Sequence, residues 1–342
     1  MNLNYLFSFT VVVALAMIAW AGIDVWGLNG LFCIAVPYVA AILFIIGFAK
    51  KVLGWADSYV PFRIPTTCGQ EKSLPWIKQN KIDNPSTTTG VVMRMFFEIV
   101  LFRSLFRNTK AKFKDNYRLS YRWEIFLWVA ALAFHYAFAV VVLRHLRFFF
   151  EPVPQFVQLL EKADSFFRFE FFAPFFKIGL PGVYLSGFVL LGALLFLLGR
   201  RIFLGQVRYV SLASDYFPLF LIIGIAASGI LMRYFAKVDV IAIKEFAMGL
   251  ASLHPKVPEG VGAIFYVHLF LVSVLVAYFP YSKLMHAGGI FLSPTRNLAN
   301  NNREKRHINP WNYSVKTHTY EEYEEEFREK MIEAGIPVEK EQ

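Results

Sequence analysis

Long apolar segments separated by polar ones dominate the hydrophobic pattern of this chain. Six of these segments carry almost no charge and are about 20 residues long, the length that an α-helix needs to cross the hydrocarbon core of a bilayer. Their predicted limits are residues 4–24, 29–49, 123–149, 180–200, 214–236 and 261–283. Backbone polar groups in lipid must be satisfied within the segment, so each one is predicted to be a helix. The pattern therefore predicts an all-α integral membrane protein, a six-helix transmembrane bundle.

Polar segments between the spans predict the parts outside the membrane. The largest is the loop of residues 50–122, which contains the apolar stretch Val91–Phe102. This stretch is too short to span easily and includes Arg94 and Glu98, so we expect an interfacial helix there. Residues 291–342 are predicted to form a soluble tail.

The tail carries its own helix signals. Thr319 and Glu322 have the spacing of a capping box, and Gly335 followed by Pro337 predicts the end of the helix. Its larger apolar side chains fall close to one face: Tyr320, Tyr323, Phe327 and Met331. Two interpretations stay open, a solvated acidic helix and a docking helix for a cytosolic partner.

Composition and charge support the membrane assignment and give an orientation. Only 18% of the residues are charged and the mean hydropathy is +0.46, whereas soluble domains are about 25% charged. Fourteen of the 35 lysines and arginines lie in residues 50–122, so the positive-inside rule places this loop and both termini in the cytoplasm. The net charge of +10 thus reflects topology, and nucleic acid is not an expected partner.

Two kinds of signal are not found in the sequence, one for signal-peptide cleavage and one for an iron–sulfur cluster. The first apolar segment has no basic n-region and no clear A-x-A site, so we interpret residues 1–28 as a retained span. Cys33 and Cys68 have no CxxC partner, which leaves this chain without an iron–sulfur motif of its own.

Four histidines provide the candidate chemistry. His135 and His145 lie in the third predicted span, while His268 and His286 lie in or at the end of the sixth. An ionisable residue within a span is a functional hypothesis by default. A single histidine could also serve only as a hydrogen-bond partner of another helix, but four on two helices make that explanation weaker.

The topology stacks these histidines in two pairs. The third span runs outward and the sixth runs inward, so His145 and His268 lie toward the outer surface, and His135 and His286 lie toward the inner one. Ten residues of helix rise about 15 Å and eighteen rise about 27 Å, so the four cannot surround one ion. Paired histidines match bis-histidine ligation of haem, in which both axial positions are filled and the haem serves electron transfer.

The spacings His135-x9-His145 and His268-x17-His286 resemble those of the NarI-like family, the di-haem b subunits of respiratory nitrate reductase. The resemblance covers residues 29–290, including the loop 50–122, and leaves residues 1–28 as an additional helix. It implies two b haems, the outer held by His145 and His268 and the inner by His135 and His286.

Four shorter strings narrow the resemblance to a subfamily. They are TTCGQ at 66–70, KIDNPSTTTG at 81–90, EIVLFRSLFRNT at 98–109 and SKLMHAGGIFLSPTRN at 282–297. Together they look like the M subunits of DsrMKJOP complexes, which are associated with dissimilatory sulfite reduction and also described as Hdr-like menaquinol-oxidising enzymes. No mechanism for these strings follows from the sequence.

The subfamily implies a partner set and a substrate. A cytoplasmic iron–sulfur subunit resembling the catalytic subunit of heterodisulfide reductase would dock on the inner face. A second membrane subunit and periplasmic multihaem c and iron–sulfur subunits would complete the complex. Menaquinol would be oxidised near the outer haem of this multi-pass protein of the inner cell membrane, and the subunit is expected to be inactive alone.

Cations near the histidines are candidates for haem propionates or for a quinone site. Arg144, Arg147, Lys162 and Arg168 are placed near the outer pair, and Arg122 and Lys283 near the inner end. Snorkelling to the lipid headgroups is the alternative for each. Two other functions stay open for the whole chain, a histidine-relay proton channel or transporter and a membrane anchor without a redox role.

Overall fold

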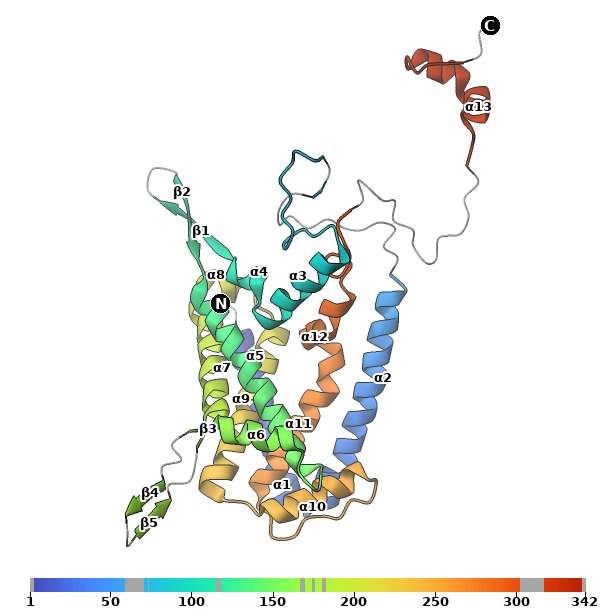
Figure 1. Ribbon diagram of the computed structural model, residues 1–342. Coiled ribbons are helices and arrows are strands. Elements are labelled where there is room, and N and C mark those ends of the chain that lie inside the picture. The colour runs from blue at the N-terminus through green and yellow to red at the C-terminus, as the bar shows by residue number, and fades with distance from the viewer. Residues whose placement is uncertain are drawn as a thin grey trace.

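The computed structural model has six membrane-length helical segments (Figure 1). It describes residues 3–58, 71–72, 74–114, 118–166, 170–173, 176–179, 183–301 and 317–339. The segments are α1 Asn4–Asp24, η1 Leu31–Ala35 with α2 Val36–Ala56, α5 Ile125–His145 with η2 Leu146–Phe148, α7 Leu185–Phe203, α9 Ala213–Leu231 with η3 Met232–Ala236, and α11 Ala263–Tyr278 with η4 Phe279–Tyr281. The prediction of six spans is confirmed, as far as length and apolar composition define a span.

Two predicted limits were wrong by several residues. The second segment continues to Ala56, because Lys50 and Lys51 stay in helical conformation and extend the last turns of α2. The fourth begins at Leu185, since Val183 and Tyr184 pair as a strand instead of starting the helix. Charge and glycine locate the polar boundary of a span, but a helix can continue past it.

The bundle is a chain of neighbouring helices. Helix α5 packs on α7, α7 on α9, and α9 on both α1 and α11, while α11 also packs on α1 and α2. Buried apolar clusters fill these contacts, for example Ala137, Leu190, Leu194 and Ile222 between α5, α7 and α9. Outward side chains such as Ile45, 65% exposed, match a surface that lies in lipid.

Glycine allows one close approach in the bundle. A Cβ atom at Gly47 of α2 would lie 2.8 Å from Cβ of Pro280 and 2.9 Å from the ring of Tyr281. Because any larger residue would clash there, Gly47 lets α2 touch the end of the sixth segment. His286 follows that segment by five residues, at the start of α12.

The prediction of an all-α protein was incomplete, because short antiparallel strand pairs lie outside the bundle. Strand β1 (Thr109–Lys114) pairs with β2 (Arg118–Trp123), β3 (Ser165–Phe166) with β6 (Val183–Tyr184), and β4 (Glu170–Ala173) with β5 (Phe176–Gly179). In TKAKFK, lysines alternate with other residue types at a period of two, and in RLSYRW, Leu119, Tyr121 and Trp123 alternate with polar or basic residues. That period is typical of a strand, but these residues had been interpreted only as topological charge.

Short helices cover both ends of the bundle. On the side of the 50–122 loop lie α3 (Thr88–Val100), α4 (Arg103–Phe106), α8 (Gly205–Val210), η5 (Lys283–Met285), α12 (His286–Gly289) and η6 (Ile290–Leu292). At the other end lie α6 (Gln155–Asp164) and α10 (Val240–Ala251) (Figure 1). Helix α10 begins after Asp239, an N-cap whose side chain accepts hydrogen bonds from the main-chain N–H groups of Ile241 and Ala242.

The predicted interfacial helix exists as α3, from Thr88 to Val100, with Thr87 as its N-cap. Its position relative to a membrane stays a prediction. Arg94 and Glu98 are only 3% and 9% exposed, so both face protein.

The tail helix α13 (Tyr320–Glu333) confirms the predicted capping box. The Thr319 side chain accepts from the backbone of Glu322, and the Glu322 carboxylate accepts from the backbone of Thr319. The helix ends before Gly335, whose φ of +67° favours glycine. A docking role for this helix stays a prediction.

Candidate functional site

The structure brings the four histidines together in two ring pairs, one near each end of the bundle. The ring centres of His145 and His268 are 6.5 Å apart, with their planes 13° from parallel. Those of His135 and His286 are 6.0 Å apart and perpendicular. In each pair one histidine lies on α5, and its partner is His268 on α11 in the outer pair or His286 at the start of α12 in the inner pair.

Every one of these histidines has its Nδ1 atom held by a hydrogen bond. Nδ1 of His135 is 2.7 Å from the Ala131 carbonyl oxygen, and Nδ1 of His145 is 2.7 Å from that of Val141. Nδ1 of His286 is 2.8 Å from the Lys283 carbonyl oxygen. A carbonyl can only accept, so these three rings carry their hydrogen on Nδ1 and keep the Nε2 lone pair free for a ligand bond.

His268 uses a side chain for the same purpose. Its Nδ1 lies 2.9 Å from Oγ of Ser228, on the neighbouring helix α9. The backbone carbonyls that hold the other three rings lie within four residues of them in the sequence, but this contact joins two helices. Sequence reasoning missed Ser228, and its only signal was a serine in an otherwise apolar stretch.

Gly229 follows Ser228 and leaves room for the same ring. A Cβ atom at Gly229 would lie 3.3 Å from Cε1 of His268, so a side chain there would press on the imidazole. The pair Ser228-Gly229 therefore sets both the hydrogen bond and the position of His268.

The spacing of the rings fits axial ligation of haem iron. A metal–imidazole nitrogen bond is about 2 Å. Two such bonds in line, with the distance from each nitrogen to its ring centre, place the ring centres roughly 6 Å apart. In the described part of the chain no group of three or more His, Cys, Asp or Glu side chains could hold a bare metal ion. The donor set thus fits two haems, each between two imidazoles.

Two of the candidate cations near the outer pair, Arg144 and Arg147, are already paired with carboxylates. Nε of Arg144 is 2.9 Å from Oδ2 of Asp164, and Nη1 of Arg147 is 2.8 Å from Oε1 of Glu161. Lys162 is exposed on α6. Arg144 and Arg147 therefore anchor α6 to the end of α5. This role differs from the two predicted for them, which were binding a propionate or quinone and snorkelling to the lipid headgroups.

Of the candidate cations near the inner pair, Lys283 is also paired with a carboxylate. Nζ of Lys283 is 2.6 Å from Oδ1 of Asp215 at the start of α9. Arg122 lies in β2, with its side chain outside what the structure describes, and Arg168 lies outside the described residues altogether. Lys283 and His286 also line a cavity of about 480 Å³, together with Trp55, Tyr278 and Tyr281.

Arg233 is a cation near the outer pair that sequence reasoning missed. Its guanidinium carbon lies 4.0 Å from the ring centre of Tyr184, and that of Arg144 lies 3.8 Å from the same centre. Within the described ranges no carboxylate lies within ion-pair distance of Arg233. Its signal in the sequence was a lone arginine at the outer end of the fifth span.

Three of the four subfamily strings meet in one cluster, which we call the inner-face cluster. It comprises residues 80–107 and 293–301, and its second part follows α12 and η6 along the chain. The main chain N–H of Asn300 donates to the Pro85 carbonyl at 2.7 Å, and Arg94 donates to the Thr295 carbonyl at 3.1 Å. Arg296 pairs with Glu98 at 3.0 Å. These strings therefore build a folded platform, while TTCGQ and Cys68 lie outside the described residues.

Asp83 is the electrostatic centre of one side of this cluster. Arg103 donates to its carboxylate at 2.8 Å, and Asn80 and Arg107 donate as well. Burial alone would raise the pKa of Asp83, but the hydrogen bonds from these three residues outweigh it and lower the pKa to about 2.

Asp83→Asn is expected to loosen the inner-face cluster. The lost ionic hydrogen bonds are worth about 1–3 kcal/mol, so amide hydrogen exchange across residues 80–107 should become faster at neutral pH. Because the folded pKa lies below the ordinary value of 3.8, the contribution is fully present above pH 4 and declines as the pH falls toward about 2. The difference between wild type and variant should shrink over that window.

Asp57→Asn is the matched control, because Asp57 is an exposed carboxylate at the same end of the bundle. It should leave exchange in residues 80–107 unchanged. Equal protection in wild type and Asp83→Asn at neutral pH would contradict the role given to Asp83.

Comparisons with known proteins agree with this geometry. Residues 95–302 match the model of the family described as nitrate reductase gamma subunit. The chain is 44% identical over 288 residues to the Hdr-like menaquinol oxidoreductase cytochrome b-like subunit of Archaeoglobus fulgidus, covering 82% of this chain and 83% of that protein. It is 40% identical over 284 residues to the protein of the same name from Archaeoglobus profundus, covering 81% of each. This membrane protein is therefore a member of the nitrate reductase gamma subunit family, as the histidine spacings had indicated.

Proposed function

We propose that this chain is a di-haem cytochrome b subunit that passes electrons between menaquinol and a cytoplasmic iron–sulfur partner. The observation that carries the proposal is the pair of histidine contacts, 6.0 and 6.5 Å between ring centres, with every Nδ1 held by a hydrogen bond. His145 and His268 would hold the outer haem, and His135 and His286 the inner one. Haem supplies one-electron redox chemistry, which the protein places and tunes.

The histidines and their partners prepare each site before any cofactor binds. Three backbone carbonyls and Ser228 orient the imidazoles and fix the hydrogen on Nδ1. The rings can then ligate without first losing a proton. Phe102 and Phe134 pack edge-on against His135, at 4.9 and 4.8 Å between ring centres, and help to hold its orientation.

The orientation in the membrane follows from charge. The basic 50–122 loop favours the cytoplasmic side of the inner cell membrane, which places His145 and His268 toward the outside. Menaquinol would be oxidised near this outer pair, losing two electrons to the chain and two protons to the outer side. The names of both Archaeoglobus relatives, menaquinol oxidoreductase subunits, support this substrate.

The inner-face cluster and helix α13 are the surfaces we assign to the cytoplasmic partner. The relatives are named Hdr-like, which supports an iron–sulfur subunit resembling the heterodisulfide reductase catalytic subunit. A second membrane subunit and periplasmic multihaem c and iron–sulfur subunits would complete a complex for sulfite-reduction-linked electron transfer.

For a propionate of the outer haem we favour Arg233 over Arg144 and Arg147. A propionate is anionic and gains most from a cation that has no other counter-ion nearby. Arg144 and Arg147 are already paired with Asp164 and Glu161, whereas Arg233 contacts only aromatic rings among the described residues.

Reduction by a menaquinol analogue tests the proposed function. The oxidised complex, mixed with the analogue, should show reduced b haem in its visible spectrum. Dithionite, which needs no binding site, serves as the control that all haem can be reduced. Reduction by dithionite without any reduction by menaquinol would contradict a quinol site on this complex.

A further inference from the structure

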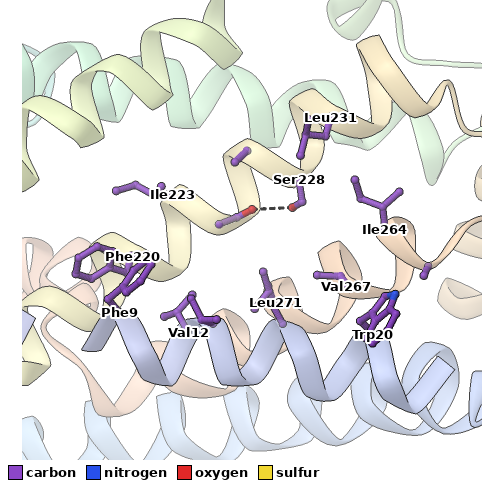
Figure 2. A pocket seen from close by; sticks show the side chains of 15 residues that line it. Phe9, Val12, Trp20, Phe220, Ile223, Ser228, Leu231, Ile264, Val267 and Leu271 are labelled. Carbon is purple, nitrogen blue, oxygen red and sulfur yellow. Dashed lines mark hydrogen bonds between the residues drawn. The ribbon is translucent and has the colours of Figure 1, made fainter. Parts of the chain in front are cut away.

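A cavity of about 560 Å³ lies between α1, α9 and α11 and is not used by any of the roles assigned above (Figure 2). Phe9, Val12 and Trp20 of α1 form one wall, and Ile264, Val267 and Leu271 of α11 form another. The third wall, from α9, contains Phe220 and Ser228. The lining is almost wholly apolar, so a charged ligand would find no counter-ion there.

Ser228 connects this cavity to the outer histidine pair. Ser228 is one of the lining residues, and its hydroxyl lies 2.9 Å from Nδ1 of His268. A ligand touching Ser228 would therefore be separated from the His268 ring by one side chain.

The hydrogen-bond capacity of Ser228 is only partly used. A hydroxyl has one donor and two acceptor lone pairs. The one hydrogen of the Ser228 hydroxyl is shared between two main-chain carbonyls, those of Gly224 at 2.7 Å and Ile225 at 3.0 Å from Oγ. With Nε2 of His268 reserved for iron, Nδ1–H donates to one lone pair. The second lone pair is left, and it can accept a hydrogen bond from a hydroxyl group.

We propose that this cavity binds menaquinol, with a headgroup hydroxyl donating to Ser228. This proposal rests on the proposed function and adds the location of its quinol site. A quinol can donate this hydrogen bond and a quinone cannot, so Ser228 would favour the reduced form. The indole N–H of Trp20, on the opposite wall, is a donor for the other headgroup oxygen.

Size and position support this ligand. Sites for small molecules enclose about 300–1,000 Å³, and this cavity lies within that range. It runs from Trp20 and Leu231, at the outer end, toward Phe9 and Phe220 (Figure 2). The apolar end can hold isoprene units of the tail at the depth where they lie in the bilayer. Helix α1, one wall of the cavity, precedes residues 95–302, the part that matches the family model.

Filling the cavity tests the proposal. Ala16 of α1 lines it, whereas Ala14 on the same helix is exposed and does not. Ala16→Phe should occupy space that the quinol needs. Ala14→Phe adds the same ring on the exposed side of α1, away from the cavity. Ala227→Leu, on the α9 wall, is a second filling variant that keeps the test decisive if Ala16→Phe does not assemble.

The probe is a menaquinol with a photoreactive diazirine at the ring end of its tail, added to the purified complex and mapped by mass spectrometry. In wild type the label should fall on residues 9–20 and 220–231 and be displaced by excess unlabelled menaquinol. Ala16→Phe or Ala227→Leu should lower this labelling about tenfold or more, which corresponds to about 1.4 kcal/mol of lost affinity. Ala14→Phe should not lower it.

Two results would overturn the cavity assignment without touching the proposed function. One is labelling elsewhere, such as around Trp55 and Tyr281, with both filling variants still reduced normally by menaquinol. The other is labelling of the cavity that excess menaquinol does not displace but excess phospholipid does, which would make it a lipid site. Failure of the proposed function looks different, because then no b haem is present or none is reduced by menaquinol.

Discussion

Replacing His145 or His268 by alanine is expected to remove the same b haem, and replacing His135 or His286 is expected to remove the other. Each substitution removes one of the two proposed axial ligands of a haem. The other imidazole is then left without its partner ring, whose centre lies 6.5 Å away in the outer pair and 6.0 Å away in the inner pair. The complex should lose one b haem per chain in every variant. Redox titration followed in the visible spectrum should show two classes of variants, each keeping one component of the wild-type curve.

His254 provides the matched control for this experiment. It is an exposed histidine at the outer end of the bundle, with its Nδ1 2.8 Å from the Ser252 carbonyl oxygen, and it belongs to neither ring pair. His254→Ala should keep both b haems. If His145→Ala and His268→Ala remove different components, the pairing across α5 and α11 is wrong.

Ser228→Ala is expected to weaken the outer haem while leaving the inner one unchanged. The substitution removes the group that holds Nδ1 of His268. Hydrogen-bond partners of metal-ligating histidines contribute about 10–100-fold to metal affinity or activity. Haem loss to an apo-acceptor protein should therefore become faster by about that factor for the outer haem, and its reduction potential should shift.

Ser273 allows a matched comparison. It is also a buried serine within a span, and its hydroxyl donates to the Leu269 carbonyl of its own helix at 2.8 Å. Ser273→Ala removes a buried hydroxyl but no contact to a histidine, so the potentials of both haems should stay at their wild-type values. A Ser228→Ala variant that behaves like Ser273→Ala would contradict a positioning role for Ser228.

The sequence predicts the membrane-spanning helices and the arrangement of the histidines on them. Apolar length alone located the six helical segments, because a helix in lipid must satisfy its own backbone. The histidine spacing and the alternating direction of the spans placed His145 beside His268 and His135 beside His286. The helical segments follow from local geometry along single helices, and the pairing follows from the opposite directions in which the third and sixth spans cross the membrane.

Contacts between distant segments could not be predicted in the same way. Ser228 and His268 are 40 residues apart, and only the packing of α9 on α11 brings them together. The same is true of Arg94 and Thr295 in the inner-face cluster, which are 201 residues apart. The carboxylates that neutralise Arg144 and Arg147 come from α6, a short helix of residues 155–164 between two predicted spans.

The haem content of the purified chain within its complex tests the central claim most directly. A pyridine haemochrome assay, calibrated against the amount of this polypeptide, measures b haem independently of any quinol activity. The account predicts two b haems per chain, falling to one in each of the four single histidine variants. A wild-type protein without b haem would contradict it.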